Sequence, residues 1–404
     1  MKKIVKMSLV AAVAVAGLTT ANAKPLEEAI KDVEVSGSVV YRYNDVNTKD
    51  GKSRTDNNYK IGLNVSSKIN DDVKLNTRFL VGENSQANGF FNSDTTDQSD
   101  GDAGVSLTNV YFSYTGIANT TVNVGKQGLT TPWTQAQQID GNEQTGTGIL
   151  ALTTVGPVTL AGAYFNQTNL NESGSLHTAL NGMAASGNVG ANDIWTAGVM
   201  ANVGPVALDA WYLSLDEIFK TYTLGAKANL DLDAVKLGAA LRYTALKFDS
   251  DTALGANSDT NNHNMVNAVL TAKAGIVDAK YAFARTGKEG GIIALDNDAA
   301  TTMQGWSVRA DGEAKSTYHQ FVVGVQAMDS VHVSANYVTK KYNEVTGVDA
   351  NKEKDTEIYA QLTYKMSSNL TSYVRFGQGE LKTDSTNTKT ETDYKGRLQI
   401  AYTF

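Results

Sequence analysis

The chain ends on the stretch YKGRLQIAYTF, residues 394–404, in which two kinds of side chain alternate. One set of alternate positions is apolar or glycine: Tyr394, Gly396, Leu398, Ile400, Tyr402 and Phe404. The other set is mostly polar: Lys395, Arg397, Gln399, Ala401 and Thr403. Successive side chains of a β-strand point to opposite faces, so this period of two predicts a strand with one apolar and one polar face.

The same alternation recurs along the chain in segments of about ten residues. We count eighteen candidate strands, an even number. They start near residues 33, 59, 73, 105, 119, 147, 157, 192, 205, 219, 233, 263, 276, 318, 331, 356, 369 and 393. The run Met303–Ala310 is ambiguous between strand and loop.

The connections between these segments alternate between short and long. The short ones carry turn residues, such as Gly156-Pro157 and Gly204-Pro205. The long ones are polar, and the longest lie near residues 84–104, 128–146, 167–191 and 287–317. Short turns at one end and long loops at the other are typical of a bacterial outer-membrane β-barrel, with the short turns facing the periplasm.

The N-terminal segment has the organisation of a secretory signal peptide. Three lysines within the first six residues precede an apolar stretch of twelve residues, and Ala21-Asn22-Ala23 is a suitable cleavage site. We therefore expect residues 1–23 to be removed and residues 24–404 to form one barrel domain in the outer membrane. Loss of the three lysines leaves 32 basic and 42 acidic residues, a net charge of −10.

The composition excludes several classes of function. There is no cysteine, so the chain has no disulfide framework, thiolate metal site or cysteine nucleophile. The acidic balance is unfavourable for binding nucleic acid. After the first twenty residues no uninterrupted apolar run exceeds four residues, which is too short for a membrane-spanning helix.

An exported chain without a spanning helix has one other way to cross lipid. Every backbone N–H and C=O must be paired inside hydrocarbon, and a closed barrel achieves this. The polar alternate face predicts a wet interior, and sixteen to eighteen strands enclose an aqueous channel. Alternation alone leaves open a secreted β-sandwich or β-solenoid with one solvated face.

Two stretches resemble a known family. Residues 25–37, PLEEAIKDVEVSG, are similar to the N-terminus of the major outer membrane porins of Campylobacter and its relatives. VNVGKQG at 122–128 followed by TPWT at 131–134 resembles the fifth strand of that family where it enters the constriction loop. The resemblance implies an eighteen-stranded, trimeric porin that passes ions and small polar solutes, and for some members a divalent cation in the channel.

The third long loop, GLTTPWTQAQQIDGNEQTG at 128–146, is the candidate constriction. We expect it to fold into the lumen, where it presents Asp140 and Glu143. Gly125 and Gly128 leave room for the inward turn, and Pro132 and Trp133 could hold the loop against the wall.

Basic residues of the first three and last two strands face the lumen by parity. They are Arg42, Lys60, Lys74, Arg78, Arg375, Lys395 and Arg397. Because a closed barrel makes the last strand a neighbour of the first, they form one arc. Acids on a loop opposite this arc would set a transverse field across the pore.

The same acids raise the possibility of a bound cation. Calcium prefers six to eight oxygen ligands, several of them carboxylates. Asp140 and Glu143 supply two, and Asp209 could be a third. A separate acidic cluster, Asp94, Asp97, Asp100 and Asp102, does not have EF-hand spacing. No cofactor is required for the expected function.

These observations favour passive diffusion of ions and small hydrophilic solutes through a general porin with a mild preference for cations. A substrate-specific channel and an adhesin that uses the external loops remain alternatives. No catalytic motif such as G-x-S-x-G or H-E-x-x-H occurs, so we do not expect an enzyme. The expected partners are outer-membrane lipid and lipopolysaccharide, two further copies of the chain, and the solutes themselves.

Overall fold

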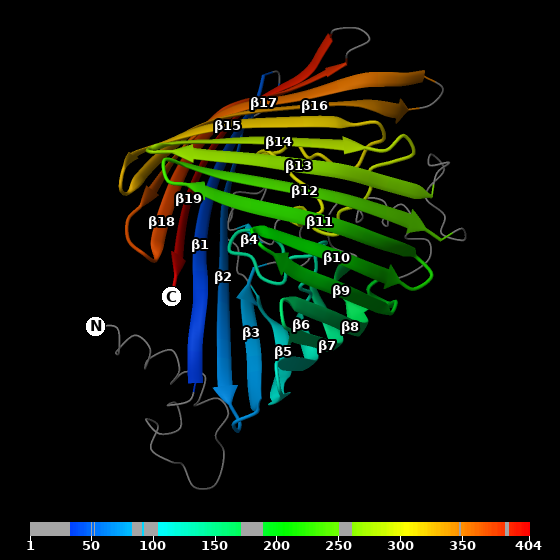
Figure 1. The fold of residues 1–404 in the computed structure, drawn as a ribbon. Helices are drawn as coiled ribbons and strands as arrows, with labels where there is room; N and C mark the ends of the chain where they lie inside the picture. Colours follow the sequence, from blue (N-terminus) through cyan, green and yellow to red (C-terminus); the bar gives the residue numbers. More distant parts are fainter. Residues whose placement is uncertain are drawn as a thin grey trace.

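The strands that the structure describes form one closed antiparallel sheet (Figure 1). The computed structural model describes residues 33–49, 51, 53–82, 91–92, 104–170, 189–249, 261–346, 349–383 and 388–404. Within these residues the barrel strands are β1 Val33–Thr48, β2 Ser53–Lys68, β3 Val73–Val81, β5 Val105–Ile117, β6 Thr120–Gly128, β7 Thr145–Val155, β8 Val158–Thr168, β9 Ile194–Val203, β10 Val206–Leu215, β11 Phe219–Leu232, β12 Val235–Phe248, β13 Asn262–Ala274, β14 Val277–Thr286, β15 Thr317–Met328, β16 Val331–Thr346, β17 Asp349–Lys365, β18 Leu370–Thr383 and β19 Thr388–Thr403. The short β4, Phe91–Asn92, pairs with β2, and a 3₁₀ turn spans Val189–Ala191.

The barrel closes where the C-terminal strand meets the N-terminal one. β19 pairs with β1 along eleven residues, from Ser38 opposite Thr403 to Thr48 opposite Asp393. The backbones of Gly37 and Phe404 exchange two further hydrogen bonds at 2.9 and 3.0 Å. Every strand therefore has two neighbours, and the prediction of an eighteen-stranded all-β barrel is confirmed.

Three strands begin several residues earlier than predicted. β2 begins at Ser53, β17 at Asp349 and β19 at Thr388. The added residues are polar on both faces, as in Ser53-Arg54-Thr55-Asp56, so no alternation marks them. The strands therefore continue past the apolar band, where both faces of the sheet lie in water.

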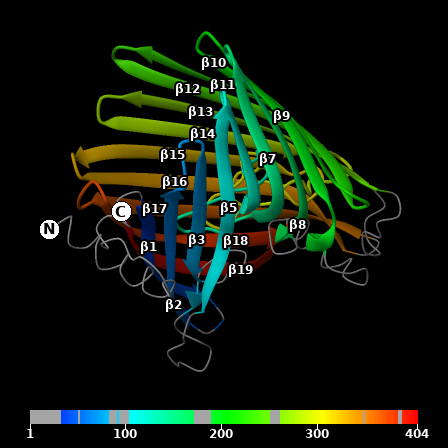
Figure 2. The same ribbon diagram turned by 90° about the horizontal axis from the view of Figure 1, so that it is seen from below.

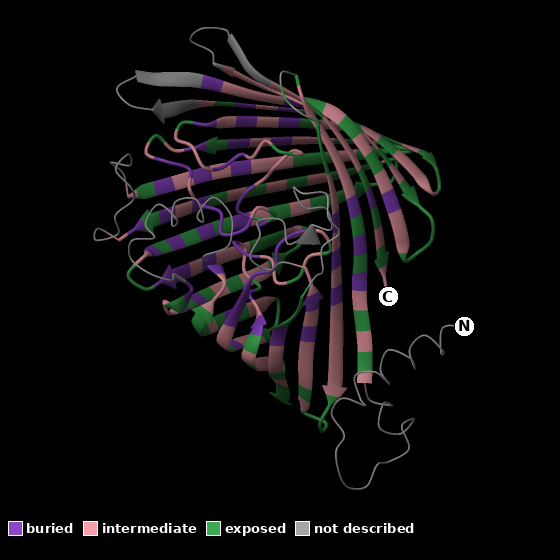
Figure 3. Cartoon of the chain, turned by 180° about the vertical axis from the view of Figure 1, so that it is seen from behind, coloured by how far each residue is buried: buried purple, intermediate pink, exposed green. Residues whose placement is uncertain are grey.

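The two faces of the wall have the predicted character. On β19 the apolar side chains point outwards, and Tyr402 is 43% exposed, whereas the inward Gln399 is 5% exposed. Figure 3 shows the resulting bands of buried and exposed residues along the strands. None of the helices among the described residues is long and apolar enough to cross a membrane.

Part of the interior is not wet, which corrects the expectation of a uniformly polar lumen. The external halves of β8 to β13 carry apolar residues on their inner face. They include Phe165, Ile194, Leu213, Leu215, Phe219, Leu246, Phe248 and Met265. These side chains pack against Leu129, Trp133, Ile293 and Leu295 of two loops. The loops thus occupy one side of the barrel on a hydrophobic core of their own.

The two loops are L3, residues 129–144, and L7, residues 287–316. L3 folds inwards as predicted. L7 was expected to be an ordinary external loop, but it also lies inside the ring of strands (Figures 1 and 2). The ambiguous run Met303–Ala310 is part of L7 and forms a small turn joined by a bridge between Gln304 and Arg309, not a barrel strand. Residues 1–23 and the cluster Asp94–Asp102 lie outside the described residues.

Candidate pore constriction

The entry into L3 depends on two glycines at the end of β6. Gly125 has a φ of +131°, and a Cβ on it would lie 2.4 Å from the carbonyl oxygen of Val110. A Cβ on Gly128 would lie 2.6 Å from the Cβ of Ala136. Neither position has room for a side chain, and glycine at both lets the backbone turn inwards here. Trp133 is fully buried, which holds the start of L3 against the core.

Glu143 joins L3 to the wall through a buried triad with Lys60 and Arg78. The Nζ of Lys60 donates to Oε1 of Glu143 at 2.9 Å. Arg78 donates from Nη2 to Oε1 at 2.6 Å and from Nε to Oε2 at 2.7 Å. Lys60 also donates to the backbone oxygens of Gln138 and Gly141 at 2.8 and 2.6 Å. The side chains of Glu143 and Lys60 are 0% exposed, so this is a fully desolvated anchor.

The triad changes the expected role of Glu143. Burial disfavours its charged form, but hydrogen bonds from Arg78 and the charges of Lys60 and Arg78 outweigh burial and lower the pKa of this carboxyl. Instead of facing the basic arc across the lumen, Glu143 sits on it and neutralises part of it. Because the acid is buried between its partners, it contributes little field of its own to the water path.

Asp140 also contacts the basic arc, but it remains 41% exposed. Its Oδ2 accepts from Nη2 of Arg42 at 3.0 Å and from Nε2 of Gln399 at 3.1 Å. The Nε of Arg42 in turn donates to Oε1 of Gln399 at 2.7 Å. Arg42 is therefore held flat against the wall at the join of β1 and β19.

Arg375 and Arg397 lie directly opposite each other on β18 and β19. Arg375 donates twice to Oε1 of Gln361, at 2.9 and 2.7 Å, and Arg397 donates to Asn44 at 2.7 Å. Within the described part of the chain neither arginine forms an ion pair with an acid. Their guanidinium carbons lie 5.2 and 5.6 Å from the ring centroid of Trp306 in L7. This pair therefore keeps its positive charge uncompensated beside an aromatic ring.

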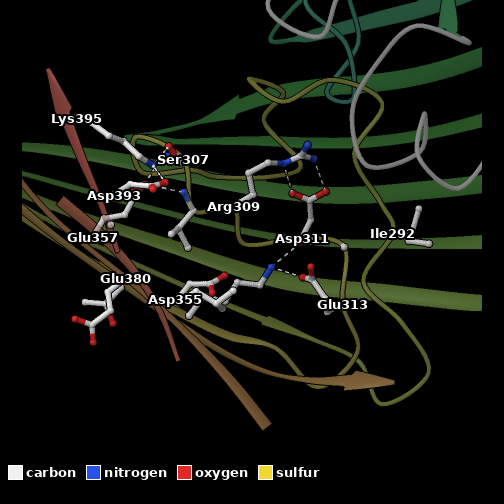
Figure 4. Close-up of a pocket in the computed structure, with 16 residues that line it drawn as sticks. Ile292, Ser307, Arg309, Asp311, Glu313, Asp355, Glu357, Glu380, Asp393 and Lys395 are labelled. Atoms are coloured by element: carbon white, nitrogen blue, oxygen red, sulfur yellow. Dashed lines mark hydrogen bonds and ion pairs between the residues drawn. The ribbon is translucent and has the colours of Figure 1, made fainter. Parts of the chain in front are cut away.

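The carboxylate of Glu357 on β17 holds the tip of L7. It accepts three backbone N–H groups, from Trp306 at 2.9 Å, Ser307 at 2.6 Å and Val308 at 3.1 Å. Lys395 adds a hydrogen bond of 2.9 Å to Oγ of Ser307. Figure 4 shows Glu357, Ser307 and Lys395 at one side of an open cavity of about 600 Å³ that residues of L7 and the wall line.

The other side of this cavity carries a second set of contacts. Lys340 donates to the backbone oxygen of Asp311 at 3.1 Å and to the carboxylate of Glu313, and Arg309 pairs with Asp311 at 2.8 Å (Figure 4). Asp355 faces the same space. L7 is thus fixed to β16 and β17 by charged groups at both ends of its inner turn.

L3 and L7 touch each other in the lumen. The side-chain amide of Gln135 donates to the backbone oxygen of Asp298 at 2.8 Å, and the N–H of Thr301 donates to the oxygen of Pro132 at 3.2 Å. Asp298 is exposed and also accepts from Gln304 at 2.7 Å. The sequence pattern indicated a long connection near 287–317 but not that L7 folds inwards, nor a role for Asp298, Trp306 and Ser307. The apolar run Ile292-Ile293-Ala294-Leu295 within a polar connection was the available signal.

The structure brings together six of the seven predicted basic residues and separates the seventh. Arg42, Lys60, Arg78, Arg375, Lys395 and Arg397 contact L3, L7 or their immediate neighbours. Lys74 is the second residue of β3, four residues before Arg78, and lies 3.7 Å from Glu34 near the periplasmic turn. That spacing corresponds to about 13 Å along the strand. Parity predicted the face of Lys74 correctly but not its height.

The predicted metal ligands already pair with basic side chains, and Asp209 lies away from the other two. Both oxygens of Glu143 accept from Lys60 and Arg78, and Asp209 forms two bonds of 2.8 Å with Arg242 on another part of the wall. No group of three or more acidic or histidine side chains suited to a metal ion occurs in the part of the chain that the structure describes. A divalent cation at Asp140 and Glu143 stays a prediction.

Asp296 is a buried carboxyl of L7, two residues before Asp298, which contacts L3. It is 1% exposed; Oδ1 accepts the N–H of Asp298 at 3.0 Å, and Oδ2 has no hydrogen-bond partner among the described residues. Burial raises the pKa of this carboxyl from 3.8 to about 6. The folded protein therefore binds a proton more tightly than the unfolded chain. The contribution of Asp296 to the free energy of unfolding is therefore fully present below pH 3.8 and is lost as the pH rises through 6.

We expect the barrel to be more heat-stable at pH 5 than at pH 7.5, by roughly 1.4 kcal/mol from this group, because pH 5 lies one unit below the folded pKa and already above the unfolded one. Asp296→Asn should remove most of that difference, because a neutral amide already replaces the protonated acid. Thermal unfolding of both proteins at the two pH values measures it. An unchanged pH dependence in the variant would contradict this role of Asp296.

Solved structures of bacterial outer-membrane channels share this fold. Pseudomonas aeruginosa OccK2, solved in complex with glucuronate, superposes with a TM-score of 0.72 at 14% identity over 93% of this chain and 98% of its own. P. aeruginosa OpdL gives 0.71 at 14% identity over 93% and 99%. Acinetobacter baumannii OccAB3 gives 0.71 at 13% over 93% and 100%. Among curated proteins no relative matches the sequence.

A family model supplies the relationship that these distant structures do not. The Campylobacter major outer membrane protein model matches residues 1–404, the whole chain. This agrees with the resemblance seen at residues 25–37 and 122–134, and with the closed barrel. It places the protein in the bacterial outer membrane as a porin, which is consistent with a non-enzymatic function. The chain belongs to the Campylobacter major outer membrane protein family.

Proposed function

We propose that the protein is a passive, water-filled diffusion channel for ions and small hydrophilic solutes, narrowed by L3 and L7 together. The observation that carries this proposal is the anchoring of both loops inside a closed barrel, L3 through Glu143 and L7 through Glu357. Barrel width sets the coarse size limit and the two loops set the finer one. No energy source or cofactor enters this mechanism.

The narrow zone combines charges of both signs. Arg42, Arg375 and Arg397 lie on the wall, and the exposed acids Asp140 and Asp298 lie on L3 and L7. A solute between wall and loops would experience a transverse field that orients water and dipolar molecules. The acid that completes this arrangement is Asp298 of L7 instead of the predicted Glu143.

A substrate-specific channel for small carboxylates is a second candidate. The arginine pair Arg375 and Arg397 offers uncompensated planar donors, which suit bidentate binding of a carboxylate. Trp306 beside them provides a flat apolar surface for the rest of the solute. The glucuronate bound by the structurally similar OccK2 is a solute of this chemistry.

Replacing both arginines tests how far they control selectivity. In R375Q/R397Q we expect the anion-to-cation permeability ratio to fall at least about fivefold, because two unit charges a few ångströms from the path contribute roughly 1 kcal/mol or more each. The reversal potential in planar bilayers under a KCl gradient measures the ratio. K236Q/K273Q is the matched control, since these lysines are also directly opposite but lie near a periplasmic turn.

Liposome swelling with neutral sugars and with monocarboxylates of equal size separates the two candidates. Equal rates that depend on size alone support the general channel. Saturable uptake of the carboxylates, lost in R375Q/R397Q, supports the specific one. The mild cation preference expected from the net charge and the homotrimer stay predictions, and conductance steps in groups of three would support the trimer. A barrel that leaves bilayers electrically silent would refute both candidates.

A further inference from the structure

The outer, lipid-facing side of the barrel carries a row of basic side chains near its external end. Cross-strand register places one residue from each of five consecutive strands, β14 to β18, in this row. They are Arg285, Thr317, Lys341, Lys354 and Lys382. All five have the parity of the outward-facing Phe321, Tyr337 and Ile358. Strands β14 to β17 lie side by side at the top of the barrel in Figure 1.

Three of the four cations in the row have no counterion among the described residues. Arg285, Lys341 and Lys354 form no ion pair with any described acid, and only Lys382 has one, to Glu380 at 3.0 Å. Lys341 and Lys354 are directly opposite each other on adjacent strands. Like charges in this arrangement repel, and side chains on neighbouring strands are only about 5 Å apart. The row is therefore suited to an anion that bridges several strands.

The height of the basic row along the barrel indicates which layer of the membrane surrounds it. Tyr281, Phe321 and Tyr337 form an aromatic row on the same face, with ring centroids 4.9 and 6.4 Å apart. The basic row lies four residues beyond this aromatic row toward the long loops. Arg285 and Lys341 are eight and ten residues from the periplasmic ends of β14 and β16, about 26 and 33 Å along the tilted strands. The apolar band of such a barrel is about 25 Å tall. It therefore lies at the level of the outer-leaflet headgroups.

We propose that Arg285, Lys341 and Lys354 bind the phosphate groups of lipopolysaccharide in the outer leaflet. A lipid with several phosphates supplies the missing negative charge, and its acyl chains lie against the aromatic row below. Between the two rows, Nδ1 of His319 is hydrogen-bonded to the hydroxyl of Tyr281 at 2.9 Å, so this face carries polar groups down to the aromatic row.

The test measures the binding of fluorescent lipopolysaccharide to the full-length barrel in detergent, for wild type and for R285Q/K341Q/K354Q. Each basic residue near an anionic lipid surface strengthens binding roughly fivefold, so three together give about a hundredfold. We expect at least a tenfold loss of affinity in the variant. The matched control, K227Q/K236Q/K273Q, removes three lysines from the inner face and should bind like wild type.

Dephosphorylated lipopolysaccharide distinguishes the phosphate from the rest of the lipid. Wild type should bind it as weakly as the variant binds the intact lipid, and added salt should weaken binding of wild type more than that of the variant. Single-channel conductance of the variant should be unchanged, which separates this proposal from the channel proposal. Equal affinity of wild type and variant, an equal loss in the control, or a change of oligomeric state without loss of lipid affinity would each overturn it.

Discussion

Replacement of Glu143 by glutamine is expected to be the most damaging single change in the lumen. The carboxylate is fully buried and receives one bond from Lys60 and two from Arg78. A neutral amide leaves two buried cations without their counterion, a defect that costs about 3–5 kcal/mol. We expect a large fall in thermal stability. We also expect noisy, larger single-channel currents, because L3 loses its anchor on β2 and β3.

Asp140→Asn is the matched control for this experiment. Asp140 lies on the same loop and also pairs with an arginine, but it is 41% exposed, so its loss should cost at most about 1 kcal/mol. Heat-dependent loss of the folded band on a denaturing gel measures stability, and planar-bilayer recording measures the current. If E143Q and D140N lowered stability equally, burial of the triad would not be the reason for its importance.

The fold was predictable because lipid imposes a simple pattern on each strand. Side chains such as Leu398 and Ile400 meet hydrocarbon, whereas Gln399 between them faces the lumen, and this contrast is legible residue by residue. The alternation of apolar and polar residues is absent where a strand extends beyond the lipid. At Ser53 and Asp349 the strands extend beyond the apolar band, both faces are polar, and the strand starts could not be predicted.

The candidate site was predictable only in part. Closure of the barrel placed Arg42 beside Arg397 as expected, because that follows from strand order and parity alone. The height of Lys74 and the partners of Glu143 could not be inferred, since they depend on how far each strand is staggered and on where a loop folds. L7 was missed for a related reason. Its place inside the barrel depends on tertiary packing of Ile293 and Leu295 against distant strands, which no local period reports.

Glu357→Ala is the second change for which a large effect is expected, and it tests L7 as directly as Glu143 tests L3. The substitution removes three hydrogen bonds to a charged acceptor, at 2.6 to 3.1 Å, from the backbone at 306–308. Bonds of this kind contribute roughly 1.5–3 kcal/mol each, although water in the lumen replaces part of that. The tip of L7 should leave the wall, and Trp306 should withdraw from Arg375 and Arg397.

Single-channel recording of Glu357→Ala should then show a higher conductance with frequent transitions. Quenching of Trp306 fluorescence by iodide should also increase. The quenching is measured in a variant that lacks the other three tryptophans. Glu357→Gln should lie between wild type and Glu357→Ala, because its amide oxygen still accepts hydrogen bonds but carries no charge. Glu34→Ala, which removes a 76% exposed acid near the periplasmic turns, should behave like wild type. Conductance and quenching that stay at wild-type values in Glu357→Ala would mean that the core contacts of Ile293 and Leu295 hold L7 in place without Glu357.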